Sequence, residues 1–171
     1  MKRKLYLLVC MVITMTLLFG CRGYNNRNSD EGTGNTVQHD DIDWEFTTYE
    51  NVNDFVGVTM IVKEETVLPT GLTVIFENNS DNRCTYGDYF LLEKKINEKW
   101  YQVPVAIEGE YGFHDIGYEL VSGDSGEWKV NWDWLYGSLN TGEYRIIKDI
   151  LDIRGTGDYD KYYMAAEFTI D

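Results

Sequence analysis

The segment 126–150 carries the clearest alternation of apolar and polar residues in the chain. From Trp128 to Trp134 every second residue is apolar, and the intervening residues are Lys, Asn and Asp. A period of two is typical of a strand with one buried face, so the pattern predicts a strand that places Trp128, Trp132 and Trp134 in the core. Three tryptophans on one face need a second layer to cover them, which favours two packed sheets.

A turn at 137–142 separates this strand from a second apolar run that contains Tyr144, Ile146 and Ile150. The segment 139–144 resembles the tyrosine corner of Greek-key sandwiches, in which a tyrosine hydroxyl donates to the backbone a few residues upstream. We therefore expect Tyr144 to have a structural role at the start of a late strand.

Further segments with strand-like patterns are bounded by turn residues. They are 56–63, 72–76, 89–96, 100–107 and 162–170. A hairpin is expected about Asn97-Glu98-Lys99, a tight turn at 122–126, and longer connections at 108–117 and 154–160. Together the patterns predict an all-β domain at residues 44–171, a single immunoglobulin-like β-sandwich of about seven antiparallel strands.

The first twenty residues have the features of an export signal. Lys2-Arg3-Lys4 precedes an apolar run at 5–19, which is shorter than the roughly 20 residues that span a bilayer. Residues 18–21, Leu-Phe-Gly-Cys, resemble a bacterial lipobox. This resemblance implies a lipoprotein signal peptide at 1–20, cleavage before Cys21, and a diacylglyceryl lipid that anchors the protein to the membrane. The alternative is an ordinary signal peptide with a coincidental cysteine.

Residues 21–43 are rich in Asn, Gly, Asp and Ser, and they are nearly free of large apolar side chains. Such a composition cannot offset the entropy of ordering, so we predict a flexible, disordered tether. The run 39–43 holds His39, Asp40, Asp41 and Asp43, but a solvated charge run is a better interpretation than a metal site. Residues 44–55 are expected to pack on the domain edge as an extended lead-in.

The chain has 29 acidic and 15 basic residues, a formal net charge of −14. An acidic surface repels phosphate backbones, so no nucleic-acid partner is expected. Of three cysteines only Cys84 lies in the domain, which excludes a disulfide within it. We expect Cys84 to be a passive thiol, although the sequence leaves its reactivity open.

Several short motifs occur in order between Val56 and Asp171, and together they resemble the bacterial Ig-like domain of Gram-positive lipoproteins. The same domain is found at the extracellular end of antibiotic-sensing membrane metallopeptidases. The resemblance implies the sandwich fold but no ligand, cofactor or catalytic residue. The motifs are Pro69-Thr70-Gly71-Leu72, Phe76-Glu77-Asn78-Asn79-Ser80, Trp100-Tyr101, Trp132-Asp133-Trp134-Leu135-Tyr136-Gly137 and Gly142-Glu143-Tyr144-Arg145-Ile146.

Three patterns suggest chemistry, and each has a simpler interpretation. Gly123-Asp124-Ser125-Gly126 copies the nucleophile turn of trypsin-like proteases, but neither His39 nor His114 is suitably placed as a base, so a plain turn is preferred. Asp158 and Asp160 could attract calcium, yet the EF-hand spacing is absent and a solvated hairpin loop is preferred. Exposed tyrosines could form a sugar-stacking face, with the candidates Tyr111, Tyr159, Tyr162 and Tyr163.

The sequence therefore predicts a lipid-anchored, extracytoplasmic lipoprotein with a non-enzymatic binding module, no cofactor and no metal site. Its partner is expected to be a protein or the cell wall, and the domain is expected to be a monomer. The alternative is an accessory envelope-sensing domain that works with a membrane protein. A hydrolase is retained only as a hypothesis to test at Ser125.

Overall fold

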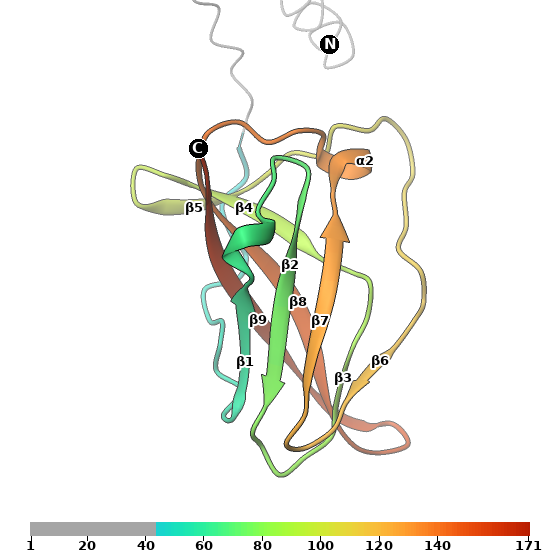
Figure 1. Ribbon diagram of the computed structural model, residues 1–171. Coiled ribbons are helices and arrows are strands. Elements are labelled where there is room, and N and C mark those ends of the chain that lie inside the picture. Colours follow the sequence, from blue (N-terminus) through green and yellow to red (C-terminus); the bar gives the residue numbers. More distant parts are fainter. Residues whose placement is uncertain (1–43) are drawn as a thin grey trace, which may run out of the picture. The chain divides into compact units, whose positions relative to one another are not determined.

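The first sheet contains the tryptophan-rich strand. In the computed structural model, which describes residues 44–171, strands β1 (Val58–Val62), β2 (Gly71–Asn78) and β7 (Ser125–Asn131) form an antiparallel sheet in the order β1-β2-β7 (Figure 1). A turn of 3-10 helix, η1 (Glu64–Thr66), lies between β1 and β2. The inward side chains of β2 and β7 follow the predicted alternation and face the second sheet.

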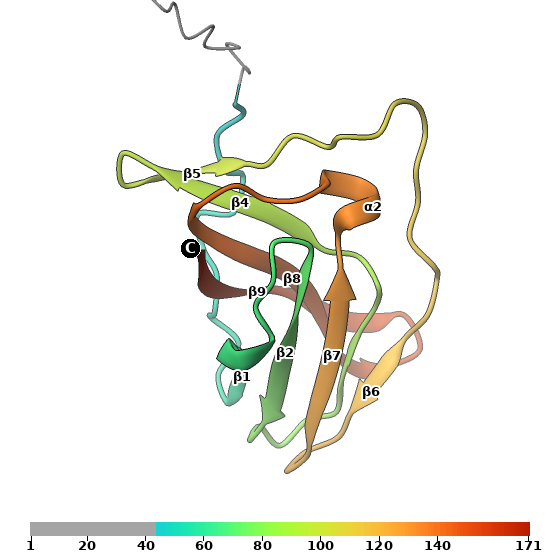
Figure 2. The ribbon, with the colours of Figure 1, turned by 45° about the horizontal axis from the view of Figure 1, so that its top comes forward.

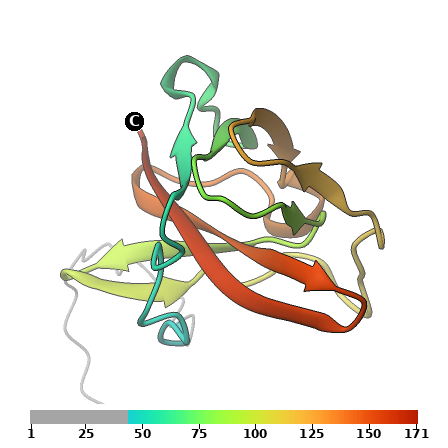
Figure 3. The same cartoon turned by 90° about the horizontal axis from the view of Figure 1, so that it is seen from below.

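The second sheet is built around strand β8. Its strands are β3 (Cys84–Tyr86), β4 (Leu91–Ile96), β5 (Lys99–Gln102), β6 (Tyr118–Leu120), β8 (Gly142–Gly155) and β9 (Asp158–Ile170). One edge of β8 pairs with β4 and then with β3, and the other edge pairs with β9 along nearly its whole length. Strands β5 and β6 extend the sheet from β4 and β3. Figure 3 shows how far the β8–β9 hairpin extends across the domain.

The two antiparallel sheets pack as a β-sandwich, which confirms the predicted fold class (Figure 2). Residues 44–171 contain nine strands instead of about seven, because β3 and β6 form in segments for which the sequence pattern predicted no strand. Each of these two strands is three residues long. A segment of that length is too short for an alternation of apolar and polar residues to be recognised.

The core between the sheets is rich in aromatic side chains. Phe76 stacks on Tyr86 with ring centroids 4.3 Å apart, and Trp132 lies 5.5 Å from Phe168. Trp132 is fully buried, and its indole N–H donates to the Pro69 carbonyl at 2.9 Å. The indole nitrogen of this large side chain therefore has a hydrogen-bond partner although it is buried, as a stable core requires.

The prediction that Trp134 lies in the core is wrong. Strand β7 ends at Asn131, whose side-chain oxygen accepts a hydrogen bond from the Asp133 N–H at 3.1 Å. Such a local side-chain bond competes with the strand ladder and favours a turn. The short helix α2 (Asp133–Tyr136) follows, and Trp134 is 44% exposed.

The predicted β4–β5 hairpin is present, but β5 is shorter than expected. Asn97 and Glu98 both have positive φ, 50° and 63°, as in the two-residue turn that matches the twist of paired strands. Strand β5 ends at Gln102 instead of continuing to Ile107. The ladder cannot continue past Pro104, because proline has no backbone N–H to donate.

The β8–β9 hairpin is longer than predicted. The connection expected at 154–160 is reduced to Thr156-Gly157, since β8 continues to Gly155 and β9 begins at Asp158. Near the start of β8, the Tyr144 hydroxyl donates to the Asn140 carbonyl at 2.7 Å, four residues upstream. This hydrogen bond ties the connection before β8 to the strand itself.

Residues 44–55 run as an extended lead-in along the second sheet. Phe46 forms an isolated β-bridge with Tyr101 and stacks on its ring at 4.6 Å. Arg145 donates to the Thr47 hydroxyl and to the Tyr49 carbonyl, each at 3.2 Å. Because side chains alternate between the faces of a strand, the lead-in covers the face of β8 that points away from the first sheet. This cover explains why residues 144–148 are all buried.

Candidate functional site

A groove of about 460 Å³ lies along β7 and α2, beside residues 112–114 of the long connection between β5 and β6. Figure 2 shows this connection arching past β7 and α2. Three short segments line the groove, and we call it the aromatic groove because four of its lining residues are aromatic. The lining residues are Asp88, Phe90, Gly112, Phe113, His114, Trp128, Lys129, Val130, Asn131 and Trp134. The volume is within the range of small-molecule sites in proteins.

Trp134 is the large exposed side chain of the aromatic groove. The Phe113 ring lies 5.7 Å from it at an interplanar angle of 71°, and the Tyr111 ring lies 6.5 Å from it at 70°. Both contacts are edge-on, so within residues 44–171 no aromatic ring is stacked flat on the indole. The α2 turn beneath Trp134 is fixed by Leu135, which is fully buried and whose carbonyl accepts from the Ala106 N–H at 2.7 Å.

Polar side chains line the aromatic groove beside these rings. Asp88 accepts a hydrogen bond from the Tyr118 hydroxyl at 3.0 Å and lies 3.3 Å from Nδ1 of His114. Asn131 uses its side-chain oxygen for the Asp133 N–H, so its amide N–H₂ group remains a donor. The aromatic groove therefore presents a fixed acceptor and a donor next to an exposed aromatic face.

Lys148 is a fully buried cation that supports one wall of the aromatic groove. Its ammonium donates to the carbonyls of Gly87 and Tyr89, and it lies 4.2 Å from the centre of the Trp128 ring. Burial lowers the pKa of Lys148 to about 8. Because Gly87 and Tyr89 flank Asp88, Lys148 fixes the turn that presents the Asp88 carboxylate. Sequence reasoning missed this role, since a lysine in an alternating strand indicates an exposed face.

The tyrosines proposed as an exposed contact face differ in their surroundings. Tyr111 is 48% exposed and lies beside Trp134, and Tyr159 is 51% exposed on β9. Tyr162 stacks on Phe55 at 4.3 Å, and Tyr163 packs edge-on against Tyr49 at 4.8 Å. Both are partly buried, so they belong to the packing of the lead-in. The residue that sequence reasoning missed is Trp134, and the pair Asn131 and Asp133 was the signal for the turn that exposes it.

The turn that resembles a protease nucleophile has an ordinary geometry. Gly123 has a φ of 80°, and the Asp124 N–H donates to the Val121 carbonyl at 3.1 Å, as expected for a tight connection into β7. His114 pairs with Asp88. In the part of the chain that the structure describes, no hydrogen bond joins Ser125 to either residue. The arrangement offers no activated serine.

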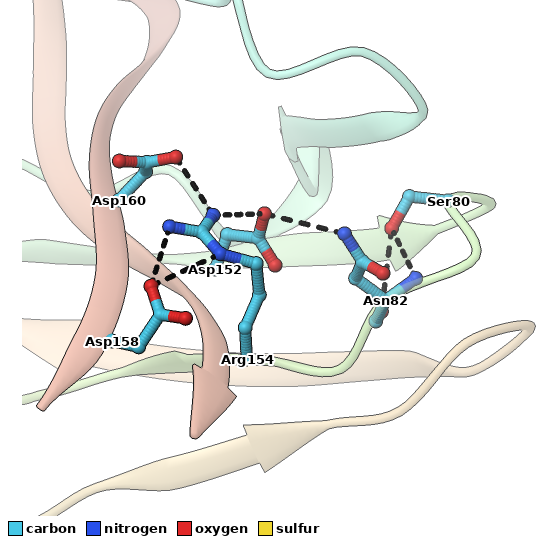
Figure 4. Close-up of polar contacts among 6 residues, drawn as sticks. All are labelled: Ser80, Asn82, Asp152, Arg154, Asp158 and Asp160. Atoms are coloured by element: carbon cyan, nitrogen blue, oxygen red, sulfur yellow. Dashed lines mark hydrogen bonds and ion pairs between the residues drawn. The ribbon is translucent and has the colours of Figure 1, made fainter. Parts of the chain in front are cut away.

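Arg154 occupies the centre of the acidic hairpin end that suggested calcium (Figure 4). Its guanidinium lies 2.9 Å from Asp158, 2.7 Å from Asp160 and 3.4 Å from Asp152. Hydrogen bonds to Asp160 and Asp158 raise the pKa of Arg154 above its usual value. Within residues 44–171 no group of three or more His, Cys, Asp or Glu side chains could hold a metal ion. The carboxylates at this end therefore pair with a protein cation.

Cys84 is fully buried on β3, and its thiol lies 3.5 Å from the Leu120 carbonyl. Burial, with a contribution from the nearby Asp152, raises the pKa of Cys84 to about 11. The reactive thiolate is therefore disfavoured at neutral pH.

Some predicted features lie outside the residues that the structure describes. These are the signal peptide at 1–20, the lipidation site Cys21 and the tether at 21–43 with its charge run His39, Asp40, Asp41 and Asp43.

Another cavity, of about 540 Å³, lies beside the C-terminal end of β9. Its lining residues include the four acidic residues Glu64, Glu143, Glu167 and Asp171. Its two aromatic lining residues, Tyr144 and Phe168, are buried, so it lacks the exposed aromatic face of the aromatic groove.

A family model described as "Bacterial Ig-like domain" matches residues 54–169. No curated protein and no solved structure matches the chain. Among residues 44–171, no helix has the length and hydropathy needed to cross a membrane. The family match includes every residue that lines the aromatic groove, so the groove is part of the matched domain.

Proposed function

Because the chain belongs to the bacterial Ig-like domain family, we propose that it is a membrane-anchored lipoprotein whose domain binds a partner outside the cytoplasm without catalysis. The family supports an extracellular interaction module of a non-catalytic fold. The aromatic groove is the observation that carries the binding proposal, because it combines a concave shape, the exposed Trp134 and the fixed Asp88 carboxylate. Function is argued from this site, since a sandwich fold alone serves many functions.

The anchoring part of the proposal is supported by the sequence of the leader. Three basic residues, an apolar run and Cys21 follow one another in the order of a lipoprotein signal. A diacylglyceryl group on Cys21 would keep the domain at the extracytoplasmic face of the membrane, within reach of the cell wall and of membrane proteins.

The anchor is tested by comparing the full chain with its Cys21→Ser variant in a bacterium that exports lipoproteins. The wild type is expected in the membrane fraction with a lipid-modified Cys21 by mass spectrometry, and Cys21→Ser is expected in the medium. Secretion of both proteins without lipid would overturn the anchor and leave a diffusible binding module.

The binding function is tested with the secreted Cys21→Ser chain, mixed with isolated cell wall and separately with membrane vesicles. Retention on either material, reduced in the additional variant Trp134→Ala, supports binding through the aromatic groove. Retention only on vesicles that contain membrane proteins favours the envelope-sensing alternative. Absence of retention on both materials would overturn the binding function.

A hydrolase hypothesis makes a different prediction. Turnover of a wall or ester substrate that is lost in Ser125→Ala would contradict a non-catalytic module. We expect no such turnover, because Ser125 has no hydrogen-bonded base in the described part of the chain.

A further inference from the structure

Resting on the proposed binding function, we propose that the aromatic groove binds an uncharged saccharide, one ring of which stacks on Trp134. The family match assigns no ligand to the groove, but the chemistry of its lining residues indicates a class of ligand. The indole face, the hydrogen-bonding groups beside it and the distribution of charge favour this ligand.

The indole of Trp134 has the properties of a stacking platform. It is 44% exposed, and its aromatic neighbours Phe113 and Tyr111 meet it edge-on at 71° and 70°. These contacts restrict the orientation of the indole ring without stacking flat on it. A sugar ring presents apolar C–H groups on its faces, and an aromatic side chain provides a flat apolar surface of similar size. The fixed α2 turn means that little side-chain freedom is lost on binding.

The polar groups of the groove suit hydroxyl groups, which both donate and accept hydrogen bonds. The Asp88 carboxylate is an acceptor held in place by Tyr118 and His114. The Asn131 amide supplies a donor, since its oxygen is already used by Asp133. A few fixed polar groups beside aromatic walls are the usual composition of a small-molecule site.

The charges of the domain and of the groove lining favour an uncharged saccharide over charged ligands. Residues 44–171 contain 24 acidic and 10 basic residues, so an anionic polymer would be repelled by the domain as a whole. Within the aromatic groove itself, Lys129 and His114 accompany Asp88, so the lining does not have the concentrated negative charge that would select a cation. A neutral ligand with many hydroxyl groups satisfies both conditions.

The experiment uses the full chain with Cys21→Ser, titrated with two neutral probes, N-acetylglucosamine trisaccharide and maltotriose, by calorimetry. Binding of at least one probe is expected, and Trp134→Ala is expected to weaken it roughly tenfold. Trp134→Tyr should retain most of the affinity because it keeps an aromatic face. Tyr159→Ala removes an equally exposed aromatic residue that does not line the groove, so it should bind like the wild type. Matching unfolding midpoints for the four proteins confirm that folding is unchanged.

The other outcomes distinguish this inference from the function on which it rests. Retention on isolated cell wall or vesicles without binding of either trisaccharide, and without competition by them, overturns the saccharide while the binding function stands. Binding of spermine in place of the sugars overturns it in favour of a cationic ligand. Equal affinities of the wild type and Trp134→Ala for a trisaccharide overturn the assignment to the aromatic groove.

Discussion

Strand β8 carries two buried cations in different surroundings, Arg145 and Lys148. Each lies over a tryptophan ring, at 4.5 Å for Arg145 on Trp100 and 4.2 Å for Lys148 on Trp128. Arg145 forms an ion pair with the fully buried Glu93 at 2.6 Å, whereas the hydrogen-bond acceptors of Lys148 are two neutral carbonyls. One strand therefore holds a buried cation paired with a carboxylate and a buried cation whose hydrogen-bond acceptors are carbonyls only.

The difference follows from the faces that the two residues occupy. Positions 145 and 148 are an odd number of residues apart, so their side chains leave β8 on opposite faces. Arg145 faces the lead-in, where Thr47 and Tyr49 accept its remaining hydrogen bonds, and it fastens that segment to the sheet. Lys148 faces the first sheet and supports the wall of the aromatic groove. Arginine keeps its charge whether it is exposed or buried, while a buried lysine can release its proton.

Loss of the Glu93 charge is expected to have the largest effect. Glu93→Gln leaves the Arg145 guanidinium buried without its carboxylate, and should reduce the free energy of unfolding by about 3–5 kcal/mol in urea denaturation. The double variant Glu93→Leu/Arg145→Met removes both charges and should recover much of this loss. A Glu93→Gln variant as stable as the wild type would show that the Arg145 charge does not depend on the Glu93 carboxylate for its compensation.

Stability should also depend on pH through Lys148. Its pKa is about 8 in the folded protein and about 10.4 in an unfolded chain, so the unfolded state binds more protons between these values. The contribution of Lys148 to the free energy of unfolding should therefore rise by about 2 kcal/mol from pH 8 to pH 10, while the raised pKa of Cys84 acts in the opposite direction over the same range. Above pH 10 the free energy of unfolding of the domain should fall, because burial raises the pKa of Tyr49, Tyr86 and Tyr136 and favours their neutral forms in the folded state.

The matched variant for this pH dependence is Lys148→Met, which keeps a long apolar side chain. Lys148→Met should lack the contribution of Lys148, so the wild type should gain about 2 kcal/mol in free energy of unfolding relative to the variant between pH 8 and pH 10. Urea denaturation of both proteins at pH 7, 8, 9, 10 and 11 measures the free energy of unfolding below and above pH 10. An identical pH dependence of the free energy of unfolding in Lys148→Met and the wild type would place the titrating group elsewhere.

The contact between Arg145 and the lead-in should contribute a smaller amount. Thr47→Val removes one acceptor of Arg145 and should reduce the free energy of unfolding by about 1 kcal/mol. Hydrogen exchange should become faster at the Gln102 amide, which donates to the Glu45 carbonyl in the lead-in. Thr48→Val is the control, since Thr48 is exposed and should tolerate the change. Unchanged exchange in Thr47→Val would mean that the lead-in is held by other contacts.

Replacement of the exposed cation Arg154 should have the smallest effect of these changes. Its partners Asp158 and Asp160 are largely exposed, and water and salt screen such pairs. Arg154→Gln should lower the unfolding midpoint slightly at low salt and leave it unchanged at high salt. A large effect that persists at high salt would show that the buried Asp152, instead of the exposed pairs, depends on Arg154.

The alternation of residues predicted the main strands because each strand buries one face. Trp128 and Val130 on β7 and the apolar positions of β2 lie in the core as the pattern indicates. The prediction failed at Trp134, because the Asn131 side chain forms a local bond that ends the strand. It also gave no sign that Arg145 is buried, since the pattern of β8 does not show that the lead-in covers its second face.

The sequence by itself determined the fold class and the acidic character of the domain, because periodicity and charge are local or summed properties of the chain. The leader with Cys21 stays a prediction. The tertiary structure decided where the aromatic groove lies and which charges are buried. Those features join residues from 88–90, 112–114 and 128–134, which packing brings together although they are far apart in the chain. Burial depends on neighbours from other strands, and no single segment specifies them.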